Sequence, residues 1–445
     1  MASVVLERKL GRLPWEFVTP VAVALALGLW GLTTPGFWYD ERVTSEVVQF
    51  GPFVYPWDAP IIPYYVIIWL WSLGGLLDSD AWLRGLSVLA TLIAVGAIAW
   101  AARILGGRKM ALAAGLVMAL APSAARYSQE ARLYALGLAL VSLAILGLVG
   151  ASHGAQKRWW WLYAVSMGVL AFVAPFALVV IPAFAMLVGL DSRMRRIWRQ
   201  WLLWTLAVAP GLLAQGLAAF RFAGMHSWVP VPTVGDLWQG LPWIASVSTD
   251  GDAYSDSLAF GLVIIVLGLL TGAGLRWLGA ASVGVIALWV GSQGPSSFWL
   301  VRSTLPLLGF LTLAAGFSLI SRRRVSFALV LALLVALAWP SWQRTRVEGG
   351  RAEDVKSAVR IVDEFSEPGD LINTKSRGWL EYGINRYAKD PGRYVFGESS
   401  EGRAWVFRGD AHDPQCSIEQ VWGIPGGGIL TLCSSLPEGW QADFQ

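Results

Sequence analysis

The chain has 445 residues, of which 56% are apolar and 14% are charged, and its mean hydropathy is +0.54. This composition excludes an ordinary soluble domain and predicts a polytopic membrane protein. The net charge of +4 says little about partners by itself. Twenty-six tryptophans fit a protein with much surface at the membrane interface, because indole prefers the headgroup level.

Histidine and cysteine give little support to a metal site. The three histidines, His153, His226 and His412, lie far apart, which argues against a multi-histidine site, and Cys416 and Cys433 lack zinc-ligand spacing. Both cysteines lie in the same polar tail, so we predict a disulfide between them if that tail is extracytoplasmic. A divalent cation stays open as a cofactor.

The basic residues predict which segments face the cytoplasm. Arg8, Lys9 and Arg12 precede the first apolar run without a cleavage pattern, so the chain is predicted to begin in the cytoplasm, uncleaved. A first helix over about 17–33 then delivers the loop 34–82 to the outside. Further clusters with few acids mark inside segments: Arg103, Arg108 and Lys109; Lys157 and Arg158; Arg193, Arg195, Arg196 and Arg199; Arg276; and Arg322 to Arg324.

Two apolar stretches, 61–77 and 83–104, lie between the outer loop and the inside cluster at Arg103, where only an odd number of crossings fits. We predict that 61–77 lies on the membrane surface, because it begins among prolines and is followed by the acidic segment DSDAWLR. About eleven crossings then result, with the C-terminus outside. The spans after the first are predicted near 83–104, 108–122, 133–150, 159–173, 176–190, 201–220, 257–275, 279–293, 303–320 and 326–340.

The composition becomes polar and mixed in charge after Pro340. We therefore predict two domains, a membrane domain over 1–340 and a soluble, extracytoplasmic α/β domain over 341–445. The segment RAEDVKSAVRIVDEF has helical apolar spacing, and PGDLIN, RYVFGE and GGGILTLCSS indicate strands. The GIPGGG run lacks the helix that a phosphate-binding loop needs.

The first outer loop is rich in acids, among them Asp40, Glu41 and Asp58. A carboxylate near the hydrocarbon boundary is costly unless it is paired or hydrated, so these residues indicate a functional site. Asp40 and Glu41 are adjacent, so their side chains diverge, and one can act while the other orients a partner. The alternative is a solvated loop acid or an ion pair with Arg42.

Three arginines are predicted to face the outside against the general trend. Arg84 begins the second span, Arg302 begins the tenth, and Arg132 lies with Glu130 and Tyr134 where an outer loop becomes a helix. A guanidinium group can form two parallel hydrogen bonds to phosphate oxygens. Together these arginines favour an anionic ligand such as a lipid phosphate. Snorkelling at helix ends is the alternative.

Five segments in order resemble the GT-C glycosyltransferases that use polyprenyl-phosphate sugars, in particular the bacterial protein mannosyltransferase and aminoarabinose transferase superfamily. They are WYDE, WDAPIIPYY, RGLSVLATLIAVGAIAWAARILGGRK, SQEARLYAL and VRSTLPLLGFL, and the tail segment EDVKSAVRIVDEFSEPGD resembles the family's extracytoplasmic domain. The resemblance covers roughly 15–340 and implies a GT-C-like helical membrane fold. Pro175-Phe176 stands where many relatives carry His-Tyr.

The resemblance implies a role for each candidate residue. Asp40 would be the general base that deprotonates the acceptor, and Glu41 its neighbour. Asp58 would contact the acceptor or a metal, because it stands where relatives often have His or Glu. The three arginines, Arg84, Arg132 and Arg302, would hold the donor phosphate.

The leading hypothesis is a membrane glycosyltransferase that moves a sugar, with arabinose or mannose as the ordinary expectation, from a polyprenyl-phosphate donor to an extracytoplasmic glycan, lipid or protein. A transporter or flippase of a lipid-linked saccharide is the first alternative, although it would more naturally show internal repeats and interrupted helices. An inactive scaffold of envelope assembly is the second. The C-terminal domain is hypothesised to help select the acceptor.

Overall fold

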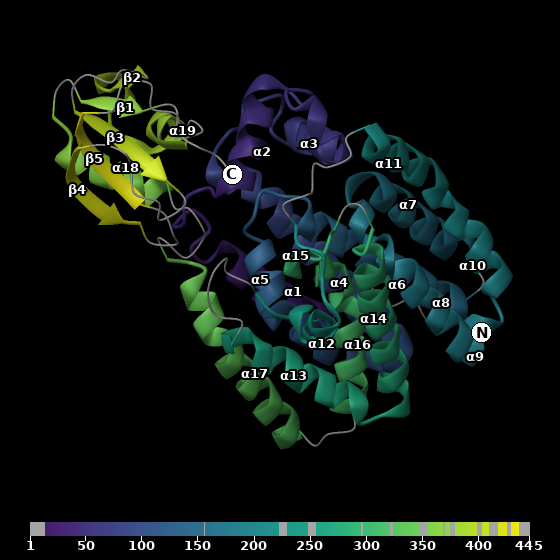
Figure 1. Ribbon diagram of the computed structural model, residues 1–445. Coiled ribbons are helices and arrows are strands. Elements are labelled where there is room, and N and C mark those ends of the chain that lie inside the picture. Colours follow the sequence, from purple (N-terminus) through teal and green to yellow (C-terminus); the bar gives the residue numbers. More distant parts are fainter. Residues whose placement is uncertain are drawn as a thin grey trace. The chain divides into compact units, whose positions relative to one another are not determined.

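The computed structural model describes residues 14–154, 156–221, 229–247, 255–294, 297–320, 324–347, 355–367, 370–373, 379–397, 403–408, 417–424 and 429–435. It divides into two compact units. The helical unit contains the described residues of 14–30, 46–247 and 255–342. The mixed α/β unit contains 31–45 and the described residues from 343 onward. Each unit is described by itself below (Figure 1).

The helical unit consists of α-helices joined by short 3-10 segments (Figure 1). Before residue 130 the elements are α1 (Trp15–Leu29), η2 (Pro56–Ile61), α3 (Ile62–Trp71), α4 (Asp80–Leu120) and α5 (Pro122–Tyr127). The middle of the chain contains α6 (Tyr134–His153), α7 (Lys157–Val173), η3 (Pro175–Val179), α8 (Val180–Leu190), α9 (Ser192–Arg195), α10 (Trp198–Thr205), η4 (Leu206–Val208) and α11 (Ala209–Arg221). The last elements are α12 (Val234–Trp243), α13 (Ser255–Leu269), α14 (Gly272–Gly291), α15 (Val301–Thr304), η5 (Leu305–Leu307), α16 (Leu308–Leu319) and α17 (Arg324–Arg344).

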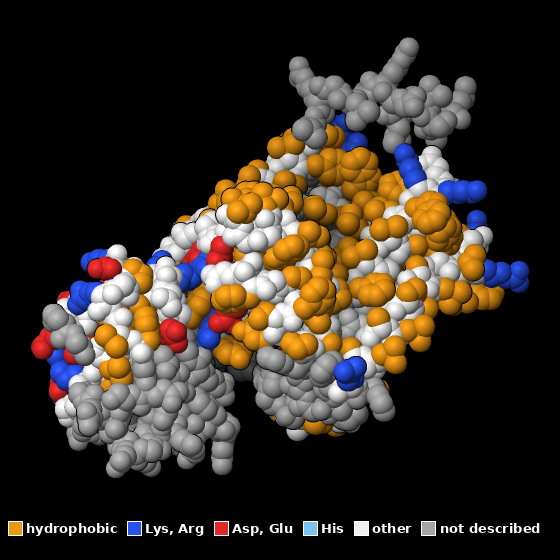
Figure 2. Space-filling view, turned by 90° about the horizontal axis from the view of Figure 1, so that it is seen from above, with side chains coloured by type: hydrophobic (Ala, Val, Ile, Leu, Met, Phe, Trp, Pro, Cys, Tyr) orange, Lys and Arg blue, Asp and Glu red, His pale blue; other side chains and the backbone are white. Residues whose placement is uncertain are grey.

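Six helical segments of the described chain are long and apolar enough to cross a membrane, by length and composition. They are Asp80–Leu120, Tyr134–His153, Trp198–Ala218, Gly272–Gly291, Val301–Leu319 and Val325–Arg344. Shorter apolar helices cover Trp15–Leu29, Pro175–Leu190 and Ser257–Leu269. Figure 2 shows hydrophobic side chains spread over the exposed face of the helical region, where a soluble protein would carry charges. The chain is therefore a membrane protein, and the count of eleven crossings stays a prediction.

Helix α4 contains a sharp break at Gly107, whose φ of +78° and ψ of −165° are not helical. A glycine adopts this conformation without the steric cost that a Cβ would impose. The break divides α4 into two arms, and these arms coincide with the separate spans predicted over 83–104 and 108–122.

One predicted helix boundary is wrong. The spans predicted over 257–275 and 279–293 placed the turn around Arg276, but α13 ends at Leu269 and α14 begins at Gly272. Thr271 caps α14, because its side chain accepts a hydrogen bond from Gly274 N at 3.0 Å. The helix therefore begins after the capping threonine, and Arg276 lies inside the helix and not in the turn.

Ion pairs join segments that were predicted to lie on the same side of the membrane. Arg276 Nη1 lies 3.0 Å from Asp191 Oδ2, so the start of α14 contacts the connection between α8 and α9. Glu16 is buried and forms an ion pair with Arg103. It forms a second ion pair with Arg108, whose Nε lies 3.5 Å from Glu16 Oε1. These contacts join the start of α1 to the break of α4, in agreement with one common side.

Hydrogen bonds likewise join predicted outer segments to one another. Ser123 Oγ donates to the carbonyl oxygen of Ile244 at 2.9 Å, and Ser297 Oγ donates to that of Pro230 at 2.9 Å. The predicted outer segment 221–256 therefore contacts both the outer segment 123–134 and the segment that precedes Arg302. Their orientation toward the outside stays a prediction.

Small residues allow some helices to approach closely. A Cβ added at Gly147 of α6 would lie 2.7 Å from Tyr163 N of α7, so the two backbones are in contact there. Close approach of this kind is the usual way in which membrane helices gain packing energy, since lipid tails are as apolar as the side chains themselves.

Helix α3 is short, and a ten-residue helix rises about 15 Å, roughly half of the hydrocarbon thickness. The 3-10 helix η2 precedes it directly and kinks at Asp58. A segment of this length does not cross the membrane alone, which supports the surface position proposed for 61–77.

The mixed α/β unit contains α18 (Val355–Phe365), α19 (Trp379–Tyr387), η6 (Pro391–Arg393) and a five-stranded sheet. The strands are β1 (Leu371–Asn373), β2 (Val395–Gly397), β3 (Ala404–Arg408), β4 (Ser417–Gly423) and β5 (Ile429–Ser435), in the spatial order β2-β1-β3-β5-β4. Strand β1 is parallel to β2 and β3, whereas β5 pairs antiparallel with β3 and β4. The segments predicted as one helix and three strands form α18, β1, β2 and β5.

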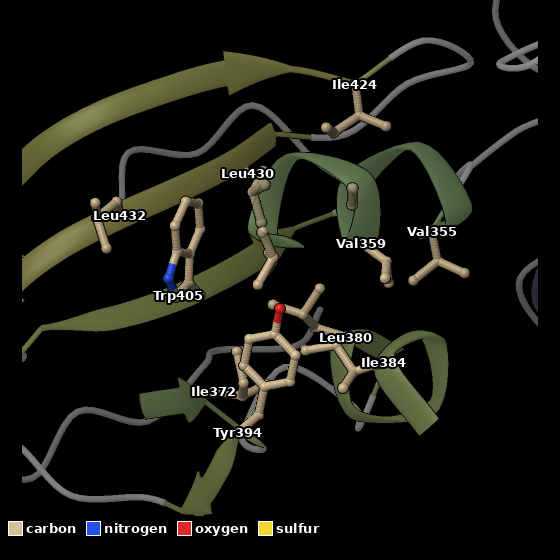
Figure 3. Packing of buried hydrophobic residues seen from close by; sticks show 12 residues of the cluster. Val355, Val359, Ile372, Leu380, Ile384, Tyr394, Trp405, Ile424, Leu430 and Leu432 are labelled. Atoms are coloured by element: carbon tan, nitrogen blue, oxygen red, sulfur yellow. The ribbon is translucent and has the colours of Figure 1, made fainter. Parts of the chain in front are cut away.

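Buried side chains from α18, α19 and the sheet form the core of this unit (Figure 3). Trp405 is fully buried, and its Nε1 donates to Asp370 Oδ2 at 3.0 Å. Helix α18 contributes apolar residues at the i, i+3, i+4 and i+7 positions, which is the spacing that made it predictable. They are Val355, Ala358, Val359 and Val362.

Cys433 of β5 is buried and takes part in a disulfide. Its predicted partner, Cys416, lies outside the described residues, so the pairing stays a prediction.

We expect Gly383→Ala to destabilise the mixed α/β unit. A Cβ at this position of α19 would lie 2.4 Å from Val355 Cγ2 and 3.0 Å from Val359 Cγ2, so α18 would have to move away. Overpacking of this kind typically costs about 1–3 kcal/mol. Thermal unfolding of the purified protein should therefore show a lower Tm. Gly392→Ala is the control, since its Cβ would meet Asp390 Oδ1 at an ordinary 3.5 Å, and equal melting of both variants would contradict the packing argument.

Candidate active site

Asp40 and Glu41 lie in the first turn of α2 (Tyr39–Phe50). The partial positive charge at a helix N-terminus stabilises carboxylates there. Their environments differ, because Glu41 is fully buried whereas Asp40 is partly exposed. Thr44 Oγ1 donates to the Asp40 carbonyl oxygen at 3.1 Å, which ties the two turns of α2 together. The adjacent carboxylates thus diverge, and Asp40 is the more accessible of the two.

Asp58 of η2 is joined to Arg132 through the hydroxyl group of Tyr65. Tyr65 is fully buried on α3, its hydroxyl donates to Asp58 Oδ2, and it accepts from Arg132 Nη1 at 3.4 Å. Burial raises the pKa of the Tyr65 phenol well above its ordinary value, with Arg132 opposing and Asp58 adding to that rise. The hydroxyl is therefore neutral at physiological pH and can act as a donor to the carboxylate.

Glu130 lies one helical turn from Arg126 in sequence, and Arg126 Nη1 is 2.7 Å from Glu130 Oε2. The Glu130 side chain is almost completely buried. Ser87 Oγ of α4 donates to the Glu130 carbonyl oxygen at 2.5 Å and approaches that of Arg132 at 3.4 Å. Arg84 is fully buried one turn before Ser87, on the face of α4 that contacts this segment.

Arg302 of α15 lies over an aromatic ring at the start of α6. Its guanidinium carbon is 5.7 Å from the Tyr134 ring centroid. The Tyr134 ring also contacts Tyr127 at 5.4 Å and Phe176 at 6.2 Å between centroids. Phe176 thus packs against Tyr134 of the predicted site, and the cation–π contact places the Arg302 guanidinium group beside the same ring.

The structure brings most of the predicted site residues into one network of the helical unit. We call this network the arginine cluster; it contains Arg84, Arg126, Arg132, Arg302, Glu130, Tyr134, Asp58 and Tyr65. Asp40 and Glu41 belong to the mixed α/β unit. We therefore propose, from the function argued below, that Asp40 and Glu41 act on a ligand held by the arginine cluster.

Two members of the arginine cluster were missed from the sequence. Arg126 lies four residues before Glu130, a spacing that favours an ion pair on a helix, and this signal could have found it. Tyr65 had no comparable signal, because its hydroxyl meets Arg132 across 67 positions of the chain.

The described residues contain no group of three or more His, Cys, Asp or Glu side chains that could hold a metal ion. Asp58 instead has a phenol and, beyond it, a guanidinium group as neighbours. The mechanism proposed below is therefore written in terms of the protein's own side chains.

Two crystal structures of ArnT, an aminoarabinose transferase from Cupriavidus metallidurans, share the fold of this chain. The structure in the apo state gives a TM-score of 0.58 at 15% identity, and the match covers 93% of this chain and 97% of ArnT. The structure bound to undecaprenyl phosphate gives 0.53 at 14% identity, covering 94% and 97%. The resemblance predicted from the five sequence segments is thus confirmed at the level of the fold. No sequence family and no curated protein matches the chain.

Proposed function

We propose that the protein is a membrane glycosyltransferase that moves a sugar from a polyprenyl-phosphate donor to an extracytoplasmic acceptor. The observation that carries this proposal is the arginine cluster, in which Arg84 and Arg132 are at least 95% buried within a helical membrane unit of the ArnT fold. Buried ionisable residues in a membrane protein mark functional sites, and guanidinium groups match phosphate geometry. One of the ArnT structures holds undecaprenyl phosphate, a ligand of this class.

The proposed reaction is a single displacement at the anomeric carbon. Asp40 takes the proton of the acceptor hydroxyl while the acceptor oxygen forms a bond to that carbon from the face opposite the phosphate. The bond between the anomeric carbon and the phosphate oxygen breaks, and its electron pair stays on the departing polyprenyl phosphate. The anomeric configuration is inverted, and no protein acid is needed because a phosphate monoester is a good leaving group.

The arginine cluster would act on the leaving group. Negative charge grows on the phosphate as the bond breaks, and fixed guanidinium donors in a site of low dielectric stabilise that charge without reorganisation. Arg84, Arg132 and Arg302 are assigned to the donor phosphate, with Tyr134 orienting Arg302. Asp58 and Glu130 are assigned to the sugar or acceptor, where carboxylates accept hydrogen bonds from hydroxyl groups.

A transport assay beside a transfer assay tests this function. Purified protein in liposomes is given undecaprenyl-phosphate arabinose and mannose, radiolabelled in the sugar, with envelope glycan and lipid acceptors. We expect label to move from the lipid donor to an acceptor. Movement of intact labelled donor between the leaflets, without any transfer, would contradict the enzyme and indicate a flippase.

We expect Tyr65→Phe to lower turnover about 3- to 10-fold, because the phenylalanine removes the hydroxyl that connects Asp58 with Arg132 and one hydrogen bond contributes about 0.5–1.5 kcal/mol. Initial rates of sugar transfer with saturating donor measure the effect. The buried ring is retained in the variant, so the fold should be kept and the expected effect is on the rate of sugar transfer.

Tyr163→Phe is the matched control. Tyr163 is also a fully buried tyrosine, and its hydroxyl is bonded at 2.9 Å to both Trp201 Nε1 and Thr205 Oγ1, away from the arginine cluster. It should lose stability to a similar extent and keep its turnover. If both variants turn over like the wild type, Tyr65 has no part in the reaction.

A further inference from the structure

Helix α19 contacts the segment that contains Asp40, and the contacting residues Phe37 and Tyr387 lie 350 positions apart in the chain. The Phe37 backbone N–H donates to the Tyr387 hydroxyl at 3.0 Å. Arg386 Nη1 donates to Ser45 Oγ at 2.9 Å. The Arg386 guanidinium carbon also lies 4.6 Å from the centroid of the Phe37 ring, a close cation–π contact. All of these residues belong to the mixed α/β unit.

Further contacts of the same unit extend this attachment. The guanidinium carbon of Arg42 lies 5.4 Å from the Tyr382 ring centroid, again on α19. Lys356 Nζ of α18 donates to the carbonyl oxygen of Thr33 at 2.9 Å. The segment 31–45 is therefore attached along its length to two helices that come from the end of the chain.

These contacts lie on both sides of Asp40 in the sequence. Phe37 precedes Asp40 by three residues and Ser45 follows it by five, and both are fully buried. One side chain, Arg386, contacts both of them. Because residues 39–50 form one helix, fixing its start and its middle fixes the direction in which Asp40 projects.

We propose that Arg386 and Tyr387 are positioning residues for the general base Asp40, so that helix α19 contributes to the reaction by fixing the direction of that side chain. This inference rests on the function proposed above for Asp40. A base must lie within hydrogen-bond reach of the proton it removes, and a displacement of about 1 Å can cost about 100-fold in rate. The contacts of α19 supply the restraint that keeps Asp40 within that reach.

The test combines hydrogen–deuterium exchange with turnover on the purified full-length protein. In Arg386→Ala, amide exchange in peptides covering 31–45 should become at least several-fold faster, and transfer from undecaprenyl-phosphate donors should fall about 10- to 100-fold. Binding of undecaprenyl phosphate itself should be unchanged, because the variant leaves the arginine cluster intact. Tyr387→Phe, which removes only the hydroxyl acceptor, should show the same changes to a smaller extent.

Two further variants separate positioning from a general loss of structure. Arg393→Ala removes an arginine of the same unit that donates to the Ser366 carbonyl oxygen at 2.9 Å, and it should leave exchange in 31–45 and turnover unchanged. Arg386→Lys keeps the charge but loses the planar group that stacks on Phe37, so it should restore turnover only in part.

Unchanged exchange of 31–45 in Arg386→Ala would refute the attachment whatever the activity of the protein. Faster exchange with wild-type turnover would refute the positioning role. Failure of the wild-type protein to transfer sugar from any donor of the panel would instead refute the proposed function, so the two failures are distinguishable.

Discussion

Asp40→Asn is expected to lower the rate of sugar transfer about 10²–10⁴-fold while binding of the polyprenyl-phosphate donor persists. Asparagine preserves the size and shape of the side chain but cannot take a proton, and a positioned general base typically contributes a factor of this size. Initial rates with radiolabelled donor measure the loss, and equilibrium binding of undecaprenyl phosphate measures what is retained.

Asp78→Asn is the matched control. Asp78 lies in the same predicted outer loop and is also partly exposed, but it accepts a hydrogen bond from Gln49 Nε2 at 2.8 Å and has no proposed catalytic role. Its variant should transfer sugar at the wild-type rate. Wild-type turnover of Asp40→Asn would remove Asp40 from the chemistry and make Glu41 or Asp58 the next residues to replace.

Arg132→Ala is expected to reduce kcat/KM about 10²–10³-fold, the usual effect of removing one donor that stabilises charge in a transition state. Arg132 is only 5% exposed and donates to the Tyr65 hydroxyl, so the alanine variant removes a fixed, buried donor from the site. Arg132→Lys should recover part of the rate, because a lysine supplies charge without the planar pair of donors.

Arg276→Ala tests whether the loss is specific to the arginine cluster. Arg276 forms an ion pair with Asp191 at 3.0 Å, at a helix start predicted to face the cytoplasm. Its removal should leave kcat/KM near the wild-type value. A similar loss in both variants would mean that the effect of Arg132 arises through stability, not through the donor phosphate.

The helices could largely be placed from sequence, because a run of apolar residues bounded by basic clusters is a strong signal. The break at Gly107 falls between Arg103 and Arg108, where the pattern predicted it. The turn before α14 lies several residues earlier than predicted, because Thr271 caps the helix and Arg276 lies within it. Local capping chemistry decides such boundaries more finely than charge does.

The candidate site was only partly predictable. Arginines at helix starts could be chosen because they break the charge pattern of the loops, and the structure places Arg132 and Arg302 beside buried aromatic residues. Tyr65 was not predictable, since a tyrosine in an aromatic-rich surface helix is usually a packing residue. The attachment of Phe37 to Tyr387 was also out of reach, because contacts across 350 positions leave no local pattern in a single sequence.

The most direct test of the central claim is the product of one turnover by the purified wild-type protein. Donors of the undecaprenyl-phosphate class, labelled in the sugar, are incubated with protein and acceptor, and both the freed lipid phosphate and the anomeric configuration of the product are determined. We predict one polyprenyl phosphate released for each sugar transferred, with the configuration inverted relative to the donor. Retention of configuration would contradict the single displacement by Asp40, and saturable donor binding without any released polyprenyl phosphate would contradict glycosyl transfer itself.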